Sequence, residues 1–175
     1  MEAIQTDERL TRRIRLVEKH VELENLHDLE GILSTFGQDA QYDDVPWADH
    51  RVGRDAVRSY YTELIGAVPE LHIDVLHRYT SSEAVILEVM ISGTHKRSWR
   101  GLPGTGRFFK FPLCAIYTFD QEDKLQAEKI YYDRAMVLKQ LGIFREPTSI
   151  LGRFLTAISH PVTVAGAFGR RILRK

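Results

Sequence analysis

The first third of the chain carries apolar residues at helical spacing. Leu10, Ile14, Val17 and Val21 recur at intervals of four, three and four, which places them on one stripe of a helix. A second, short helix is predicted to begin after Asp28, because an aspartate at a helix start accepts hydrogen bonds from unpaired backbone N–H groups. A third amphipathic helix is predicted from apolar positions at i, i+3, i+4, i+7 and i+8, namely Val57, Tyr60, Tyr61, Leu64 and Ile65.

From Leu71 onward the apolar pattern changes to a period of two, which is typical of strands. Four strands are predicted, over residues 71–79, 83–95, 107–119 and 124–133, and turn-forming residues separate them. An extended piece around 40–45 precedes them. The third of the four has one face that is entirely apolar or aromatic and must therefore be covered: Phe109, Phe111, Leu113, Ala115, Tyr117 and Phe119.

Helices followed by a run of strands predict an α+β fold, with the helices packed on one side of a curved antiparallel sheet. Residues 1–146 are expected to form this domain. Residues 147–175 have two amphipathic segments and are rich in basic residues, so we expect a C-terminal helical extension.

Composition limits the classes of protein to consider. With 175 residues, 43% hydrophobic and 27% charged, the chain fits one soluble globular domain with a C-terminal extension. Its 24 basic and 24 acidic side chains cancel, which argues against a nucleic-acid partner. The single Cys114 can form no internal disulfide, and no apolar run approaches the roughly 20 residues that span a bilayer. A cytoplasmic location is expected.

Four motifs in order carry a family resemblance. They are Ser92-Gly93-Thr94-His95, the glycine-rich turn from Gly101 to Gly106, Tyr131-Tyr132-Asp133, and the helix end Gln140-Leu141-Gly142. Together they resemble the SnoaL-like polyketide cyclases of the nuclear-transport-factor-2-like superfamily. The resemblance implies a cone-shaped, cystatin-like fold with three helices on the concave side of the sheet. It also implies a hollow interior that holds a small apolar ligand.

Asp133 is the first candidate catalytic residue. It ends a predicted strand and starts a helix, so it can be a helix cap, with Gly142 as the C-terminal cap. Alternatively it lies at the pocket wall, where partial burial would raise the pKa of its carboxyl group and make it a better base toward a carbon acid. The resemblance implies this general-base role for Asp133. Strict alternation would place Asp133 on one strand face with Leu125, Ala127, Lys129 and Tyr131.

His95 is the second candidate, at the end of a strand face formed by apolar residues. It can be a hydrogen-bonded edge residue, whereas the resemblance implies that it polarises a carbonyl group or relays a proton. Tyr131 and Tyr117 could donate hydrogen bonds to an enolate oxygen or simply anchor packing. The residues expected to line the ligand site are Tyr131, Tyr117, Phe109, Leu113, Val89, Tyr60 and Trp47.

Other chemistries find no support in the sequence. The Gly101–Gly106 turn lacks the Lys-Ser/Thr ending and following helix of a phosphate loop, and no His/Cys cluster has metal-ligand spacing. Neither a cofactor nor a metal is expected. Cys114 has no evident histidine partner, so it is interpreted as a packing residue.

The expected function is a cofactor-free cyclase or isomerase. A carboxylate would remove a proton alpha to a carbonyl group of a small apolar or polyketide-like compound, and neighbouring donors would stabilise the enolate. The alternative is a non-catalytic carrier of a small hydrophobic ligand, since one fold hosts many functions. Side chains of Asp133 and His95 directed into one cavity favour the enzyme, and an Asp133 bonded only to its own helix favours the carrier.

Two surfaces of the chain are candidates for association. A homodimer is expected through the sheet face that carries Lys110, Cys114 and Ile116. The C-terminal segment either closes the barrel or packs on a partner subunit, or it is a basic amphipathic segment that lies on a membrane surface.

Overall fold

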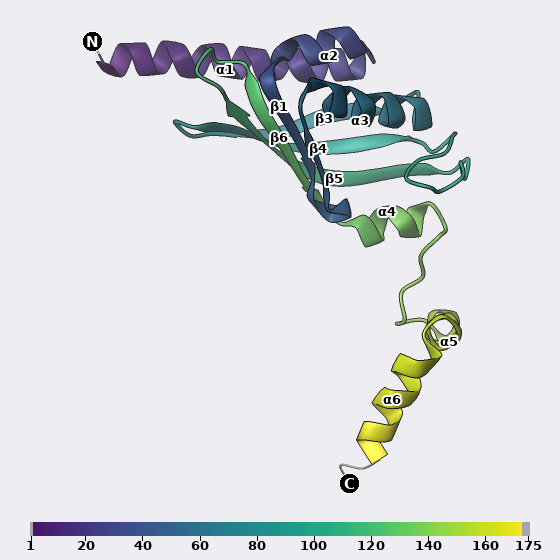
Figure 1. The fold of residues 1–175 in the computed structure, drawn as a ribbon. Coiled ribbons are helices and arrows are strands. Elements are labelled where there is room, and N and C mark those ends of the chain that lie inside the picture. Colours follow the sequence, from purple (N-terminus) through teal and green to yellow (C-terminus); the bar gives the residue numbers. More distant parts are fainter. Residues whose placement is uncertain (1, 173–175) are drawn as a thin grey trace.

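Three helices cover one face of a sheet in the computed structural model, which describes residues 2–172, with the side chains of residues 8–166. They are α1 (Glu2–Asn25), α2 (Leu29–Thr35) and α3 (Arg54–Ala67), and Figure 1 shows all three above the strands. Asp28 begins α2 as expected, because its carboxylate accepts the backbone N–H of Gly31 at 3.0 Å. The three helices predicted from the sequence are confirmed.

Six strands form one sheet in the order β2-β1-β6-β5-β4-β3. Their bounds are β1 (Phe36–Asp44), β2 (Asp49–Val52), β3 (His72–Thr80), β4 (Ala84–Thr94), β5 (Phe108–Phe119) and β6 (Leu125–Tyr132). The antiparallel meander of β3 to β6 is confirmed. The expectation of an antiparallel sheet throughout needs one correction, since β1 pairs with β6 in parallel. Phe36 lies opposite Leu125, so β1, which follows α2, begins at the same end of the sheet as β6.

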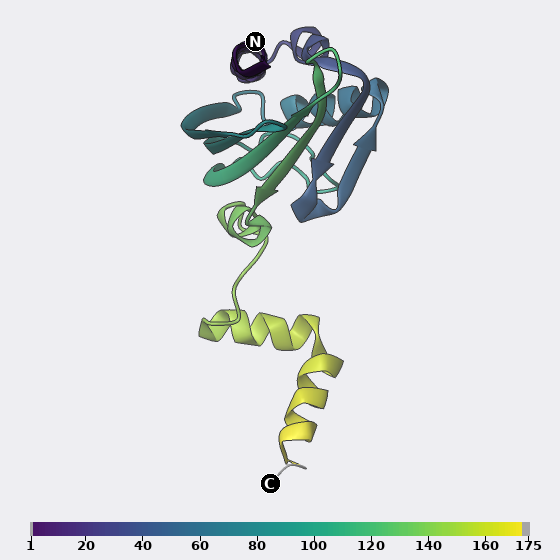
Figure 2. The same cartoon turned by 90° about the vertical axis from the view of Figure 1, so that its left-hand side faces the viewer.

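The core lies between the helices and the concave face of the sheet. The apolar face of β5 is buried along its whole length, from Phe109 to Phe119. Buried residues of β4 alternate with partly buried ones, and Leu87 and Val89 lie opposite Ala115 and Leu113. Figure 2 shows how the strands curve beneath the helices. The predicted α+β cone is therefore the observed fold.

A β-bulge decides which side chains of β6 face the core. The pairing with β5 shifts between Thr118 and Phe119, so that Gln126 is an extra residue in β6. Alternation restarts after it, and the inward-facing residues become Glu128, Ile130 and Tyr132. The face predicted from strict alternation, with Lys129, Tyr131 and Asp133, is therefore the outer one.

The chain after β6 leads away from the sheet. A short helix α4 (Arg134–Gln140) packs on β5, and α5 (Ile150–Ser159) and α6 (Pro161–Ile172) extend beyond it in both Figures 1 and 2. Within residues 2–172, no helix combines the length and the hydropathy that crossing a membrane requires. The homodimer through the outer sheet face near Cys114 stays a prediction.

Candidate functional site

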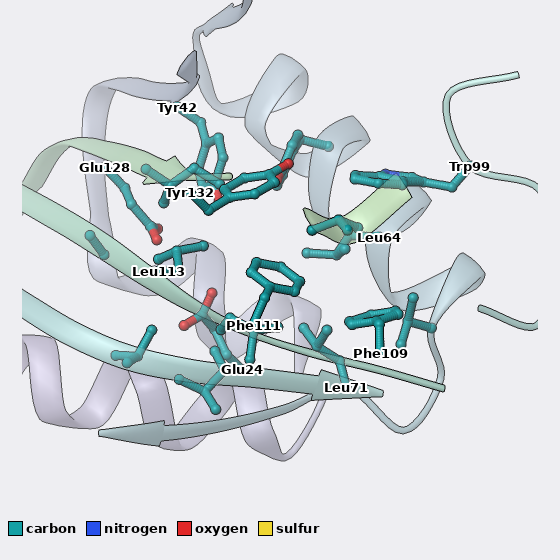
Figure 3. A pocket seen from close by; sticks show the side chains of 18 of the residues that line it. Glu24, Tyr42, Leu64, Leu71, Trp99, Phe109, Phe111, Leu113, Glu128 and Tyr132 are labelled. Carbon is teal, nitrogen blue, oxygen red and sulfur yellow. The ribbon is translucent and has the colours of Figure 1, made fainter. Parts of the chain in front are cut away.

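A small cavity opens inside the cone, between the concave face of the sheet and the helices. Its volume is about 70 Å³, and its wall is predominantly apolar and aromatic. Figure 3 shows side chains from the strands, from α1 and α3, and from the β4–β5 connection converging on it. Six of the residues expected at the site line this cavity: Tyr60, Val89, His95, Phe109, Leu113 and Tyr117.

Three other expected residues are not part of the cavity wall. The Asp133 carboxylate is exposed and accepts the backbone N–H of Met136 at 3.1 Å, so it is the N-cap of α4. Tyr131 is 43% exposed on the outer face of β6. Trp47 packs edge-on against Trp99, with ring centroids 5.4 Å apart, outside the lining. The bulge in β6 is the physical reason for the placement of Tyr131 and Asp133.

A buried acid–base cluster lies beside the cavity, and its two glutamates form part of the cavity wall. It consists of His20 and Glu24 from α1, Tyr61 from α3 and Glu128 from β6. The Tyr61 hydroxyl lies at the centre, 2.7 Å from Glu128 Oε2, 3.0 Å from Glu24 Oε1 and 3.1 Å from His20 Nε2. Figure 3 shows the carboxyl groups of Glu24 and Glu128 approaching the cavity from opposite walls.

The hydrogen bonds around His20 define its protonation. The Thr35 hydroxyl donates to the carbonyl of Ile32 at 2.6 Å, so it accepts a proton from His20 Nδ1 at 2.8 Å. Burial lowers the pKa of His20, but the neighbouring Glu24 and Glu128 outweigh this effect and raise the pKa above its usual value. Nε2, the other ring nitrogen of His20, lies 3.2 Å from Glu128 Oε2, so the two side chains form an ion pair when the ring is protonated.

Glu24 holds its proton to unusually high pH. Burial is the largest cause and raises the pKa of Glu24 to about 8, although the charge of His20 and the Tyr61 hydroxyl oppose it. Its Oε1 accepts from Tyr61, whereas Oε2 is buried and has no hydrogen-bond partner among the described residues. Buried polar atoms are usually paired, so an unpaired carboxyl oxygen in the wall of a cavity is free for a ligand.

The same cluster is the one set of potential metal ligands among the described residues. Ligand atoms of His20, Glu24 and Glu128 lie within 4.8 Å of one another. The Tyr61 hydroxyl stands within hydrogen-bond distance of all three, at the point on which they converge. This donor set fits a proton network better than a metal site, because the point of convergence is already filled by Tyr61.

His95 supplies a second unpaired polar atom to the cavity wall. Its Nδ1 accepts the backbone N–H of Thr105 at 3.4 Å, which leaves the proton on Nε2. Burial lowers the pKa of His95, so the ring is neutral at physiological pH. Nε2 is buried and has no partner among the described residues. His95 thus lies in the cavity wall with one ring nitrogen held by Thr105 and with Nε2 available as a hydrogen-bond donor.

The β4–β5 connection reaches the cavity through Trp99 and is fixed by the next residue, Arg100. The Arg100 guanidinium donates to Asp44 Oδ2 at 2.8 Å and to Asp49 Oδ2 at 2.9 Å. It also lies against the rings of Trp47 and Trp99, 5.3 and 5.2 Å from their centroids. Burial raises the pKa of Asp44 despite the adjacent positive charge. Arg100 therefore holds this connection in place.

We expect Arg100→Lys to lower the free energy of unfolding by about 2 kcal/mol, because an ammonium group cannot bridge two carboxylates as a guanidinium does. Urea denaturation measures the loss. Arg58→Lys is the matched control, since Arg58 pairs with Glu30 in solvent and the change there should be barely measurable. Equal losses in the two variants would show that Arg100 does not hold the connection in place.

Comparisons with known proteins give a consistent family and fold. The family model of the SnoaL-like polyketide cyclases matches residues 14–141. AclR, a putative hydroxylase from Streptomyces galilaeus, is a similar solved structure with a TM-score of 0.67 and 20% identity, covering 78% of this chain and 99% of its own. No curated protein matches the chain.

Two further solved structures share the fold. The epoxide hydrolase/cyclase-like enzyme SalBIII, which has a role in pyran ring formation in the polyether salinomycin, has a TM-score of 0.63 and 21% identity, over 75% of this chain and 96% of its own. A putative SnoaL-like polyketide cyclase from Jannaschia sp. CCS1 has a TM-score of 0.66 and 13% identity, over 75% and 92%. With a family match over most of its length and this hollow α+β cone, the chain belongs to the SnoaL-like polyketide cyclase family.

Proposed function

We propose that the protein is a cofactor-free cyclase or isomerase that removes a proton alpha to a carbonyl group of an apolar, polyketide-like compound. Glu24 is the base in this proposal, and it takes the place that the sequence had suggested for Asp133. His95 donates a hydrogen bond to the oxygen on which negative charge develops. The cyclase-type function at family level rests on the family match, whereas substrate and mechanism are proposals.

One observation carries the choice of Glu24. Its Oε2 is a buried carboxyl oxygen without a partner in the wall of a mostly apolar cavity. Its other oxygen is held by Tyr61, which fixes the orientation of the group. A carboxyl group whose pKa is near 8 is a stronger base, once ionised, than one in water, and this suits abstraction from a weak carbon acid.

The reaction balances on these residues. The alpha proton moves to Glu24 Oε2, and the electron pair of the broken C–H bond forms the enolate, whose oxygen accepts from His95 Nε2. In a cyclase, the enolate carbon then forms a C–C bond with a second carbonyl group of the same molecule. The resulting alkoxide recovers the proton from Glu24, which returns to its starting state. In an isomerase, the proton returns to a different carbon.

A substrate with rings needs more room than the cavity offers in this conformation. The volume of about 70 Å³ is under half of the ~150 Å³ of an apolar cavity that binds benzene. Residues 95–107 supply His95 and Trp99 to the wall and contain two glycines at positive φ, Gly101 and Gly106. We propose that this connection moves to admit the substrate, with the Arg100 contacts restoring the closed state.

Turnover of a substrate panel tests the proposal. Poly-β-ketoesters and 3-ketosteroids contain acidic alpha protons in an apolar frame, and the wild-type protein should cyclise or isomerise at least one of them. Product formation is followed by mass spectrometry and chromatography, and binding by tryptophan fluorescence. If several compounds bind tightly and none is converted, the protein is a ligand carrier and not an enzyme.

Substitutions of His95 test the donor role. His95→Leu should lower kcat by about 10²-fold, the lower end of what the loss of one oxyanion donor costs. His95→Gln places an amide N–H near the position of Nε2 and should recover part of the rate. Steady-state kinetics on the converted substrate measures both. Equal rates in the Leu and Gln variants would mean that His95 only fills space.

A non-catalytic ligand carrier is the second candidate. The predominantly apolar wall of the cavity favours it, since such a site retains an apolar molecule whether or not a reaction follows. In a carrier, the acid–base cluster would serve only to orient a carbonyl group of the ligand. Glu24→Gln would then alter affinity alone.

A further inference from the structure

The segment after the family match presents apolar side chains to solvent. Helix α5 begins at Ser149, whose hydroxyl accepts the backbone N–H of Gly152 at 3.0 Å, and a turn at His160 separates it from α6. Ile150 is 89% exposed, Phe154 61% and Ile158 60%. Large apolar side chains exposed together mark an interaction site on a soluble protein.

These side chains form one continuous face of α5. Ile150, Leu151, Phe154, Leu155 and Ile158 recur at i, i+1, i+4, i+5 and i+8, which places them within one side of the helix. The opposite side carries Gly152, Arg153, Thr156 and Ser159. We name the first set the α5 apolar face. Val162 of α6 follows it along the chain and is also exposed.

Charge is segregated toward this end of the chain. After residue 143 the sequence has six basic side chains, Arg145, Arg153, Arg170, Arg171, Arg174 and Lys175, and one acidic side chain, Glu146. The whole chain has 24 of each sign, so 18 basic and 23 acidic residues precede this segment. The last four of these basic residues lie beyond the described side chains and enter only through the sequence.

An apolar helix face next to excess positive charge fits one partner best. Peripheral membrane helices insert such a face among lipid acyl chains, while basic residues contact anionic headgroups. A second copy of the chain would cover the apolar face but bring two positively charged segments together. The ten residues of α5 are too few to span a bilayer, and Pro161 follows the turn after them, so the helix would lie in the interface.

We propose that residues 149–175 bind the surface of an anionic phospholipid bilayer, with the α5 apolar face inserted between the lipids. The α+β domain is then held at the membrane by its C-terminal end, on the far side of α4 from the sheet. This proposal does not depend on the chemistry of the cavity.

Co-sedimentation of the full chain with vesicles tests the proposal. We expect binding to mixed phosphatidylserine–phosphatidylcholine vesicles, weaker binding at higher ionic strength, and little binding to pure phosphatidylcholine vesicles. Phe154→Asp should weaken binding by about tenfold or more, because it puts a charge on the inserted face. Thr156→Asp adds the same charge on the polar side and should bind nearly as wild type does.

Three outcomes would overturn the proposal. The first is no binding of the wild type to anionic vesicles. The second is equal weakening by Phe154→Asp and Thr156→Asp, since charge alone would then explain the attraction. The third is that the wild type self-associates in analytical ultracentrifugation, that Phe154→Asp abolishes this self-association, and that vesicles do not change it. The α5 apolar face would then bind a second copy of the chain. Circular dichroism of both variants checks that the domain remains folded.

Discussion

Glu24→Gln should lower kcat by about 10²–10⁴-fold on any substrate that the wild type converts, the loss typical of removing a positioned general base. The amide has the same size and can still accept from the Tyr61 hydroxyl, which bonds Oε1 at 3.0 Å. It cannot take up a proton at neutral pH. Substrate affinity should change little, so kcat should fall while KM stays nearly the same.

Asp133→Asn is the matched control for this prediction. Asp133 is exposed and caps α4, and an asparagine oxygen can accept the same N–H of Met136. Its rate should therefore equal that of the wild type. A large loss in Asp133→Asn with normal turnover in Glu24→Gln would return the role of base to Asp133, and would require a rearrangement of β6 in solution.

The pH dependence of the rate follows from the same carboxyl group. Glu24 is ionised to only about a tenth at pH 7, because its pKa is raised to about 8. If its carboxylate is the base, kcat rises with pH and levels off above that value. A rate that falls over the same range would make protonated Glu24 a general acid.

The fold was readable from the sequence because its signals are local. Apolar periods of 3.6 and of 2 identified the three helices and the four strands of the meander, and they depend only on which residues face the core. The parallel pairing of β1 with β6 depends on contacts between distant segments, such as Tyr42 with Glu128, which no local period encodes.

The site was only partly readable, for two physical reasons. Strict alternation placed Asp133 and Tyr131 on the cavity side of β6, whereas the bulge at Gln126 turns Glu128 and Tyr132 to that side. In α1, the helix face predicted from its apolar residues also carries polar residues that face the core. Val17, His20 and Glu24 recur at three and four residues, on the same helix face as the buried stripe, and this spacing could have identified the cluster.

Buried titratable groups that sequence periodicity places among apolar residues are candidates for function, because they are costly to retain. Exposed carboxylates at helix starts, such as Asp133, have a sufficient structural role in capping. The proposed base, Glu24, lies on α1, so neither the strand alternation nor the four sequence motifs pointed to it.

The buried proton on Glu24 should also make the protein less stable as pH rises. The folded state retains a proton up to a pKa of about 8, whereas the unfolded chain loses it near 4.5. Since the folded state then binds more protons, the free energy of unfolding decreases with pH over this interval. The full decrease attributable to Glu24 is roughly 3–5 kcal/mol, an upper limit set by the size of the pKa shift. The raised pKa of His20 acts in the same direction above its usual value.

Glu24→Gln isolates this contribution, because an amide resembles the protonated acid and cannot ionise. Urea denaturation at a series of pH values should give similar stability for variant and wild type near pH 5, and a variant that is more stable by roughly 2–4 kcal/mol near pH 8. Glu22→Gln, two residues away on the exposed side of α1, should follow the wild type. Carboxylates whose pKa is lowered, such as Asp49 and Asp123, act in the opposite direction but only at lower pH. If Glu24→Gln were less stable than the wild type near pH 8, Glu24 would be an ionised structural partner of His20. Greater stability combined with lost turnover would instead show a base kept at a cost to the fold.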